Sequence, residues 1–193
     1  MGGDQRLIRE YLRGNAAAFD RLSDRHAAAL GRFSYHLTGH RTEAEDLCQS
    51  TWLAALHSLP TYAGHSTFRA WLHGIALNLC RDQRRKPTLH TVDLDPELPS
   101  ARGESDPQRA AESAETAQRL RTGLAALDAE RREVLLLVKL QGLSYEEAAA
   151  ALQVPVGTIR SRVHYAMAAL RAALEGTLES EVHHDVQPCP RET

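Results

Sequence analysis

Residues 142–170 read "GLSYEEAAAALQVPVGTIRSRVHYAMAAL" and decide the fold of the C-terminal part of the chain. Ser144, followed three positions later by Glu147, predicts a capping box. In this motif the hydroxyl accepts a hydrogen bond from the amide of Glu147, and the carboxylate accepts one from the amide of Ser144. Leu143 and Ala148 stand where a hydrophobic staple would close the same turn. A helix is therefore expected to start at Ser144.

Pro155 ends that helix, because proline cannot continue the hydrogen-bond ladder, and a second helix is expected over about residues 156–174. Its apolar residues recur at steps of three and four, as one buried face requires: Val156, Ile159, Val163, Ala166, Leu170 and Leu174. In the first helix, Ala148, Ala149 and Leu152 form a small-residue side, which allows another helix to approach closely.

Two helices joined by a short turn, with cationic and hydrogen-bonding residues near the start of the second, are the parts of a helix-turn-helix. Arg160, Arg162 and Arg171 meet no acid within residues 156–174, where an acid would oppose DNA phosphates. The candidate DNA contacts are Thr158, Arg160, Ser161, Arg162, His164 and Tyr165. An ordinary helical hairpin with a solvated basic face is the alternative interpretation of this stretch.

Residues 66–86, "STFRAWLHGIALNLCRDQRRK", predict a helix that is both a core element and a cationic rod. Its apolar stripe consists of Phe68, Trp71, Leu72, Ile75, Ala76 and Leu79. Within residues 66–86, Asp82 is the single acidic residue, and the basic residues are Arg69, Arg81, Arg84, Arg85 and Lys86. The preceding residues 59–66, "LPTYAGHS", form a loop suited to holding an unstacked base by stacking and by hydrogen bonds to its edge.

A further helix is expected over residues 42–56, "TEAEDLCQSTWLAAL". The residues expected to face inward are Ala44, Cys48, Trp52, Ala55 and Leu59. Glu45, Asp46 and Gln49 lie on a different side of this helix. That side is either a solvated face or a docking face for a basic or amide-rich partner helix.

Composition restricts the number of domains and the classes of protein to which the chain can belong. The chain has 193 residues, 42% hydrophobic and 5% aromatic, which suits two small helical cores as well as one large core. Its formal net charge is −2, so any binding of nucleic acid must come from local charge asymmetry. Three scattered cysteines give no disulfide framework, and no signal-peptide or membrane-span pattern is found. A cytoplasmic protein without a membrane anchor is expected.

The expected fold class is all-α, with two small helical domains at residues 4–86 and 108–176, the second containing the helix-turn-helix. Prolines and acids over residues 87–107 predict a flexible acidic linker. This segment is either a solvated spacer or a mimic of nucleic acid inside a basic channel. A flexible tail is expected over residues 177–193.

Metal and enzyme chemistry find little support. His183, His184 and Cys189 offer three ligands where zinc usually takes four, and His36 and His40 lie one helical turn apart. No metal and no cofactor are expected. No nucleophile and base at useful spacing, and no phosphate-binding loop, are found, so an enzyme is not expected.

Three blocks together resemble one family: "EAEDLCQSTWLAAL", "FRAWLHGIALNLCRDQRRK" and "LAALDAERREVLLLVKLQGLSYEEAAAALQVPVGTIRSRVHYAMAAL". In order and spacing, over about residues 18–174, they are similar to the extracytoplasmic-function sigma factors of bacterial RNA polymerase, in the sigma-70 family. The resemblance implies an alternative sigma factor that binds core polymerase and directs promoter-specific initiation. It also implies control by an anti-sigma factor and a linker that threads toward the RNA exit channel.

The resemblance implies three sets of site residues. Docking on the clamp helices of the largest polymerase subunit falls to Glu45, Asp46, Leu47 and Gln49. Melting the minus-ten element and capturing a flipped base fall to Tyr62, Gly64, His65, Ser66, Arg69, Asn78, Arg81, Arg84 and Arg85. The candidate DNA contacts within residues 158–165 correspond to the reader of the minus-thirty-five element.

Four positions depart from the family pattern. His73 and Gly74 stand where members commonly have an aromatic and a long or basic residue, and a mid-helix glycine costs up to about 1 kcal/mol relative to alanine. Tyr165 and Met167 replace residues that are frequently basic. For this reason, the strength of promoter melting and the DNA sequence of the upstream element cannot be transferred from other family members.

Two other classes of function remain as alternatives. A conventional helix-turn-helix regulator would bind duplex DNA alone, usually as a dimer, but it leaves the basic helix with Trp71 without a purpose. A polymerase-free adaptor or antagonist would keep the helical fold and dock on protein instead.

Overall fold

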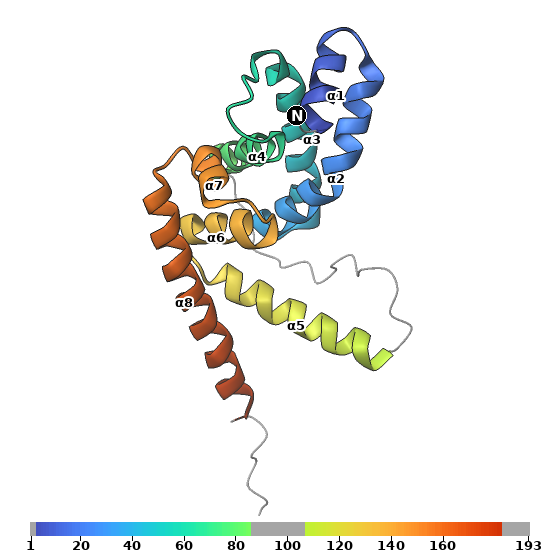
Figure 1. Cartoon of the computed structure of the whole chain (residues 1–193). Coiled ribbons are helices and arrows are strands. Elements are labelled where there is room, and N and C mark those ends of the chain that lie inside the picture. The colour runs from blue at the N-terminus through green and yellow to red at the C-terminus, as the bar shows by residue number, and fades with distance from the viewer. Residues whose placement is uncertain (1–2, 86–106, 183–193) are drawn as a thin grey trace, which may run out of the picture.

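The computed structural model describes residues 3–85 and 107–182, with side chains described within residues 3–85 and 115–174. Every regular element among them is helical, which confirms the all-α class (Figure 1). The N-terminal bundle contains α1 (Gly3–Leu12), α2 (Ala16–Thr38), α3 (Arg41–Ser58), the short 3-10 turn η1 (Leu59–Thr61) and α4 (Phe68–Arg85). The C-terminal helices are α5 (Pro107–Ala125), α6 (Ala129–Leu135), the π-helical turn η2 (Leu136–Leu140), α7 (Tyr145–Leu152) and α8 (Val156–Val182).

Local signals start and end the helices of the N-terminal bundle. Gly39 ends α2 in the left-handed region, with φ of 84°, and its amide donates to the carbonyl of Tyr35. Helix α1 is tied to α2 by the carboxylate of Asp4, which lies 2.5 Å from Arg25 and 3.0 Å from His26. The large side chains fully buried between these helices include Phe33, Phe68, Leu22, Leu30, Leu47 and Leu72.

Helix α4 is buried on two sides, whereas the sequence predicted one apolar stripe. Phe68, Leu72 and Ala76 are buried as predicted, but Trp71, Ile75 and Leu79 are only partly buried. Gly74, outside the stripe, is also buried because α7 covers that side of α4 (Figure 1), and His73 is buried against Phe33 of α2.

The helix-turn-helix forms as the sequence predicts. The hydroxyl of Ser144 accepts from the amide of Glu147 at 3.1 Å, and the amide of Ser144 donates to its carboxylate at 2.8 Å. Helix α7 ends at Leu152, and Gln153 turns the chain in the left-handed region, with φ of 56°. Helix α8 starts at Val156, three residues after Gln153.

Helix α8 is longer than predicted. It reaches Val182 instead of residue 174, so the segment expected as a tail from residue 177 begins inside the helix. The acidic linker lies outside the described residues apart from Pro107, which begins α5. Residues 183–193, including His183, His184 and Cys189, also lie outside them.

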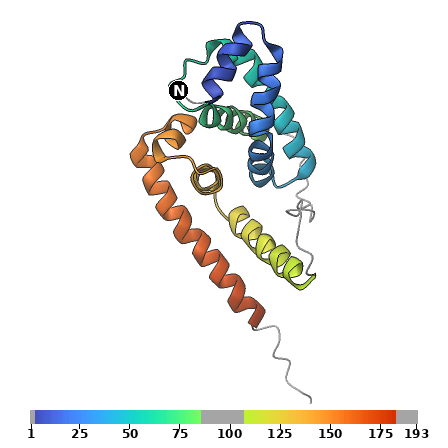
Figure 2. The ribbon, with the colours of Figure 1, turned by 45° about the vertical axis from the view of Figure 1, so that its right-hand side comes forward.

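Helix α7 and the π-helical turn after α6 pack against the N-terminal bundle, and Figure 2 shows α6 end-on below it. The π-helical turn places Leu135, Leu136 and Leu137 in the interior together. Beyond it, the side-chain amide of Gln141 donates to the carbonyl of Ala29 in α2 at 3.2 Å. The described buried apolar residues form one continuous cluster. The separate cores that composition allowed are therefore joined.

No helix among the described residues is long and apolar enough to cross a membrane.

His73 is an unusual member of this interior. Its side chain is fully buried, its Nδ1 donates to the carbonyl of Arg69 at 2.7 Å, and its ring lies edge-on to Phe33 at 4.7 Å. Nε2 has no hydrogen-bond partner among the described residues. Burial, aided by the charge of Arg69 and by His26, lowers the pKa of His73 from 6.5 to about 4.

We predict that the free energy of unfolding falls as the pH is lowered from the pKa of His73 in the unfolded chain, 6.5, toward its pKa in the folded protein, about 4. The unfolded chain binds the proton more readily there, so protonation favours unfolding. The free energy of unfolding should fall by about 2 kcal/mol between about pH 7 and pH 5 on account of this residue. Urea denaturation across that range should show a correspondingly weaker pH dependence in His73→Leu.

The matched control is His57→Leu, because the His57 ring makes the same bond to a carbonyl four residues back, at 2.8 Å, on the exposed face of α3. Equal pH dependence in the wild type and in His73→Leu would contradict the assignment.

Candidate nucleic-acid interface

The loop before α4 is closed on itself. The hydroxyl of Tyr62 donates to the carbonyl of Ser66 at 2.5 Å, which ties the two ends of the loop together. Gly64 has φ of 74°, a conformation that side-chain-bearing residues rarely adopt. His65 is exposed at the tip. The sequence-predicted loop residues are therefore brought together as one surface feature.

Trp71 belongs to the same surface, although the sequence placed it in the core stripe. It is partly buried, and its ring centroid lies 4.9 Å from that of Tyr62. Phe68 lies behind both rings, at 6.1 Å from Tyr62 and 5.6 Å from Trp71. An aromatic platform next to a polar loop is a surface on which an unpaired base can stack.

The predicted polar and basic residues of α4 lie in three settings. Asn78 and Arg85 are exposed on the last turns of the helix. Arg84 donates to the carbonyl of Leu37 at the end of α2, at 2.7 Å, and so helps to close the N-terminal bundle. Arg69 and Arg81 instead contact the C-terminal helices.

Arg81 is paired with a buried acid. Its Nε donates to Oε1 of Glu133 in α6 at 3.2 Å, and its terminal nitrogen donates to Oε2. Glu133 is only 2% exposed. The hydrogen bond from Arg81 to Glu133 raises the pKa of the guanidinium. Glu133 lies 52 residues further along the chain, so no local sequence pattern predicts this pair.

The start of α8 presents most of the predicted reading residues. Arg160, Ser161, His164 and Tyr165 are exposed, and Tyr165 is 60% exposed. Thr158 is half-buried, and its carbonyl accepts from the hydroxyl of Ser161 at 3.0 Å. The face is therefore polar and accessible, as a major-groove reader requires.

Arg162 corrects the sequence interpretation of this face. No acid opposes it within α8, but Glu130 of α6 forms an ion pair with it at 2.6 Å. The side chain of Arg162 is 23% exposed. Arg160 is thus the more accessible cation of the two.

The predicted docking residues of α3 also divide. Glu45, Asp46 and Gln49 are exposed, and Glu45 pairs with Arg41 at 3.0 Å. Leu47 is fully buried, so its side chain belongs to the core and not to the surface. A groove between α2 and α3 runs beside the exposed residues, lined in part by Arg32, Tyr35, Cys48 and Gln49.

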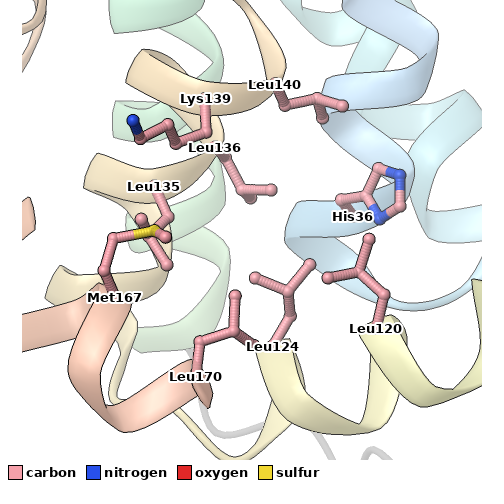
Figure 3. A pocket seen from close by; sticks show the side chains of 9 residues that line it. All are labelled: His36, Leu120, Leu124, Leu135, Leu136, Lys139, Leu140, Met167 and Leu170. Carbon is pink, nitrogen blue, oxygen red and sulfur yellow. The ribbon is translucent and has the colours of Figure 1, made fainter. Parts of the chain in front are cut away.

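An apolar pocket lies between the end of α2 and the C-terminal helices (Figure 3). It is lined by His36, Leu120, Leu124, Leu135, Leu136, Lys139, Leu140, Met167 and Leu170. Met167, which stands where family members are frequently basic, points into this pocket. Burial lowers the pKa of His36. Within the described ranges, no group of three or more potential ligands could hold a metal ion.

Two family descriptions match the chain. Sigma-70 region 2 matches residues 22–88, and sigma-70 region 4 matches residues 117–170. The ECF RNA polymerase sigma factor SigL of Mycobacterium tuberculosis is 35% identical over 162 residues, covering 83% of this chain and 90% of SigL.

Two solved structures resemble the whole arrangement. The structure of CnrH in complex with the cytosolic domain of CnrY matches with a TM-score of 0.70 and 31% identity, covering 91% of this chain and 99% of that one. The sigma factor RpoE of Bartonella quintana, in complex with the anti-sigma factor NepR, matches with a TM-score of 0.66 and 29% identity, covering 81% and 96%.

We predict that the two arginines of α8 contribute unequally to DNA binding. Arg160→Ala should weaken binding to duplex DNA and reduce the slope of log affinity against log salt by about 1, because one phosphate contact is lost. Arg162→Ala should have the smaller effect, because Glu130 already neutralises that cation. Fluorescence anisotropy over a salt series measures both slopes. Equal losses would show that the ion pair with Glu130 breaks on binding.

Proposed function

The chain belongs to the sigma-70 family, as an extracytoplasmic-function (ECF) sigma factor that directs core RNA polymerase to promoters, and we propose how its helices divide that work. Helix α3 docks on core polymerase, the loop and exposed part of α4 act on the minus-ten element, and α8 reads the minus-thirty-five element. The observation that supports this division is that one chain carries two different exposed surfaces, an aromatic one beside a polar loop before α4 and a polar, basic one at the start of α8.

The surface at the start of α4 suits a single strand. Tyr62 and Trp71 offer aromatic faces, and the loop offers Ser66 and the exposed His65 for hydrogen bonds to a base edge. Extruding a base from a duplex costs a few kcal/mol, and stacking on an aromatic ring recovers about 1–3 kcal/mol per base. Capture of a flipped base at this loop therefore favours the melted state of the promoter.

The surface at the start of α8 suits a duplex. Arg160 supplies a phosphate contact, which fixes register, while His164 and Tyr165 are placed to contact base edges. Duplex binding by α8 and single-strand capture by α4 are different tasks. A conventional helix-turn-helix regulator needs only the first of them.

The exposed acids of α3 suit a cationic partner. Glu45, Asp46 and Gln49 lie on one open face, and we propose this face as the site for the polymerase clamp helices. We assign the protein no catalysis of its own and place it in the cytoplasm, where core polymerase works. An anti-sigma factor is the proposed regulator, since RpoE, a similar protein of known structure, was solved with one.

The direct test is transcription by purified core polymerase from a library of genomic fragments, with and without this protein. Transcripts that start only when the protein is added, and that share paired upstream motifs, are the expected result. If no new starts appear and the protein fails to co-purify with core polymerase, the conventional regulator or the adaptor replaces this proposal.

We predict that point variants can weaken polymerase binding and DNA binding independently of each other. The double variant Asp46→Ala, Gln49→Ala should weaken binding to core polymerase at least roughly tenfold, because a few hot-spot residues of an interface each contribute about 2 kcal/mol or more and we propose these two as such residues. Its binding to duplex DNA should stay unchanged. Arg160→Ala should show the reverse pattern. Loss of core binding in Arg160→Ala to the same extent would refute the assignment of these surfaces.

A further inference from the structure

The first turn of α1 lies against the loop that leads into α4. Figures 1 and 2 both show the start of α1 beside this loop. A Cβ atom added to Gly64 would lie 3.7 Å from Nε2 of Gln5, so the side-chain amide of Gln5 is within contact range of the loop. Gln5 is itself exposed. A polar side chain from another helix therefore borders the surface on which an unpaired base can stack.

Helix α1 is held in this place by apolar and polar contacts. Leu7 and Ile8 are buried in the N-terminal bundle. The carboxylate of Asp4 lies 3.0 Å from Nε2 of His26 in α2. Because these contacts fix the first turn of α1, the backbone of Gln5 has a fixed position relative to the loop, and only its side chain has to adjust. Such preorganisation reduces the entropy cost of a contact with a ligand.

The same anchor reaches the aromatic platform. His26 is buried, and its ring centroid lies 5.2 Å from that of Phe68. Phe68 in turn lies behind the rings of Tyr62 and Trp71. Burial raises the pKa of the Tyr62 hydroxyl, and the negative charge of Asp4 adds to this rise. Asp4, His26 and Phe68 thus connect the first turn of α1 to the stacking surface.

The side-chain amide of Gln5 has the chemistry that is needed to recognise a base edge. A base extruded from a duplex exposes its edges to hydrogen bonds while its face stacks on an aromatic ring. Glutamine offers one acceptor oxygen and two donor hydrogens, and it pairs well with adenine, which presents N6 as a donor beside N7 as an acceptor. Stacking alone tolerates every base. An amide beside the stacking surface can therefore supply the discrimination that stacking lacks.

We propose that Gln5 is a specificity-determining residue that selects adenine as the base captured at the loop before α4. This inference rests on the proposed function, because it takes the loop, Tyr62 and Trp71 as the site of base capture. The two aromatic rings supply stacking, and Gln5 adds the hydrogen bonds that depend on the identity of the base. The match to sigma-70 region 2 begins at residue 22. Gln5 thus adds base selection from a helix that precedes the matched region.

The test uses the holoenzyme, assembled from purified core polymerase and the full-length protein. One promoter found with the library of genomic fragments is converted into a set of templates with randomised minus-ten positions, each template with a barcode in its transcribed part. Counting the barcodes in the transcripts gives the base preference at every minus-ten position.

Two variants and one control are compared with the wild type. Gln5→Ala removes the amide, whereas Gln5→Glu keeps its shape but offers only acceptors when ionised. The matched control is Gln83→Ala, the same change at an exposed glutamine near the end of α4. Gln83 lies about 22 Å along the helix from Phe68, at about 1.5 Å per residue, and so lies far from the loop.

The wild type and Gln83→Ala should prefer adenine at one minus-ten position of the non-template strand. In Gln5→Ala this preference should fall roughly tenfold, because a paired contact to the base edge is lost, while the preferences at the other positions stay unchanged. Gln5→Glu should shift the preference at the same position toward cytosine, whose amino group donates to a carboxylate.

Three outcomes would overturn the proposal: an unchanged preference in Gln5→Ala, an equal loss of transcription with all four bases, or a preferred base other than adenine at the affected position. An equal loss with all four bases would show that Gln5 only supports the loop. If the wild type gives no transcripts that depend on it, the proposed function is wrong and the inference falls with it. If such transcripts appear but Gln5→Ala keeps the wild-type preference, only the role of Gln5 is wrong.

Discussion

The close approach of α7 to α4 at Gly74 is the constraint on which the rest of the structure depends. Because Gly74 has no side chain, the carbonyl of Ala151 can lie against it, and the small side chains of α7 fill the remaining space. This approach buries a second side of α4, and α6 places Glu133 against Arg81 further along the same helix. Next to Gly74, His73 lies against Phe33 of α2 and stays neutral at pH 7 because burial lowers its pKa to about 4.

Arginines with carboxylate partners recur where nucleic acid is expected to bind. Arg81 pairs with Glu133 and Arg162 pairs with Glu130, so both acids come from α6. An overall net charge of −2 thus conceals basic surfaces that the protein's own acids partly neutralise. Buried ion pairs contribute less to stability than their number suggests, because desolvation offsets the attraction. Their role as alternatives to phosphate fits the proposed function better than a role in stability alone.

Features fixed by neighbours in sequence could be predicted, and contacts between distant segments could not. The capping box at Ser144 and the turn before α8 depend on residues within one or two helical turns, and both formed as predicted. Glu133 and Glu130 gave no such signal, because their partners lie in other helices. The position of Met167 in α8 does not by itself distinguish a DNA-facing side chain from one that lines a pocket. Leu47 is fully buried, although the family resemblance placed it on the docking surface. Gly74 departs from the family pattern in the sequence, but only the packing of α7 explains the absence of a side chain there.

The most direct measurement is transcription by purified core polymerase from a library of genomic fragments, with the wild-type protein and with Arg160→Ala. The account predicts starts that depend on the wild-type protein and share paired upstream motifs, and a loss of those starts in Arg160→Ala while the variant still binds core polymerase. Unchanged starts in Arg160→Ala, or no starts that depend on the wild-type protein, would contradict it.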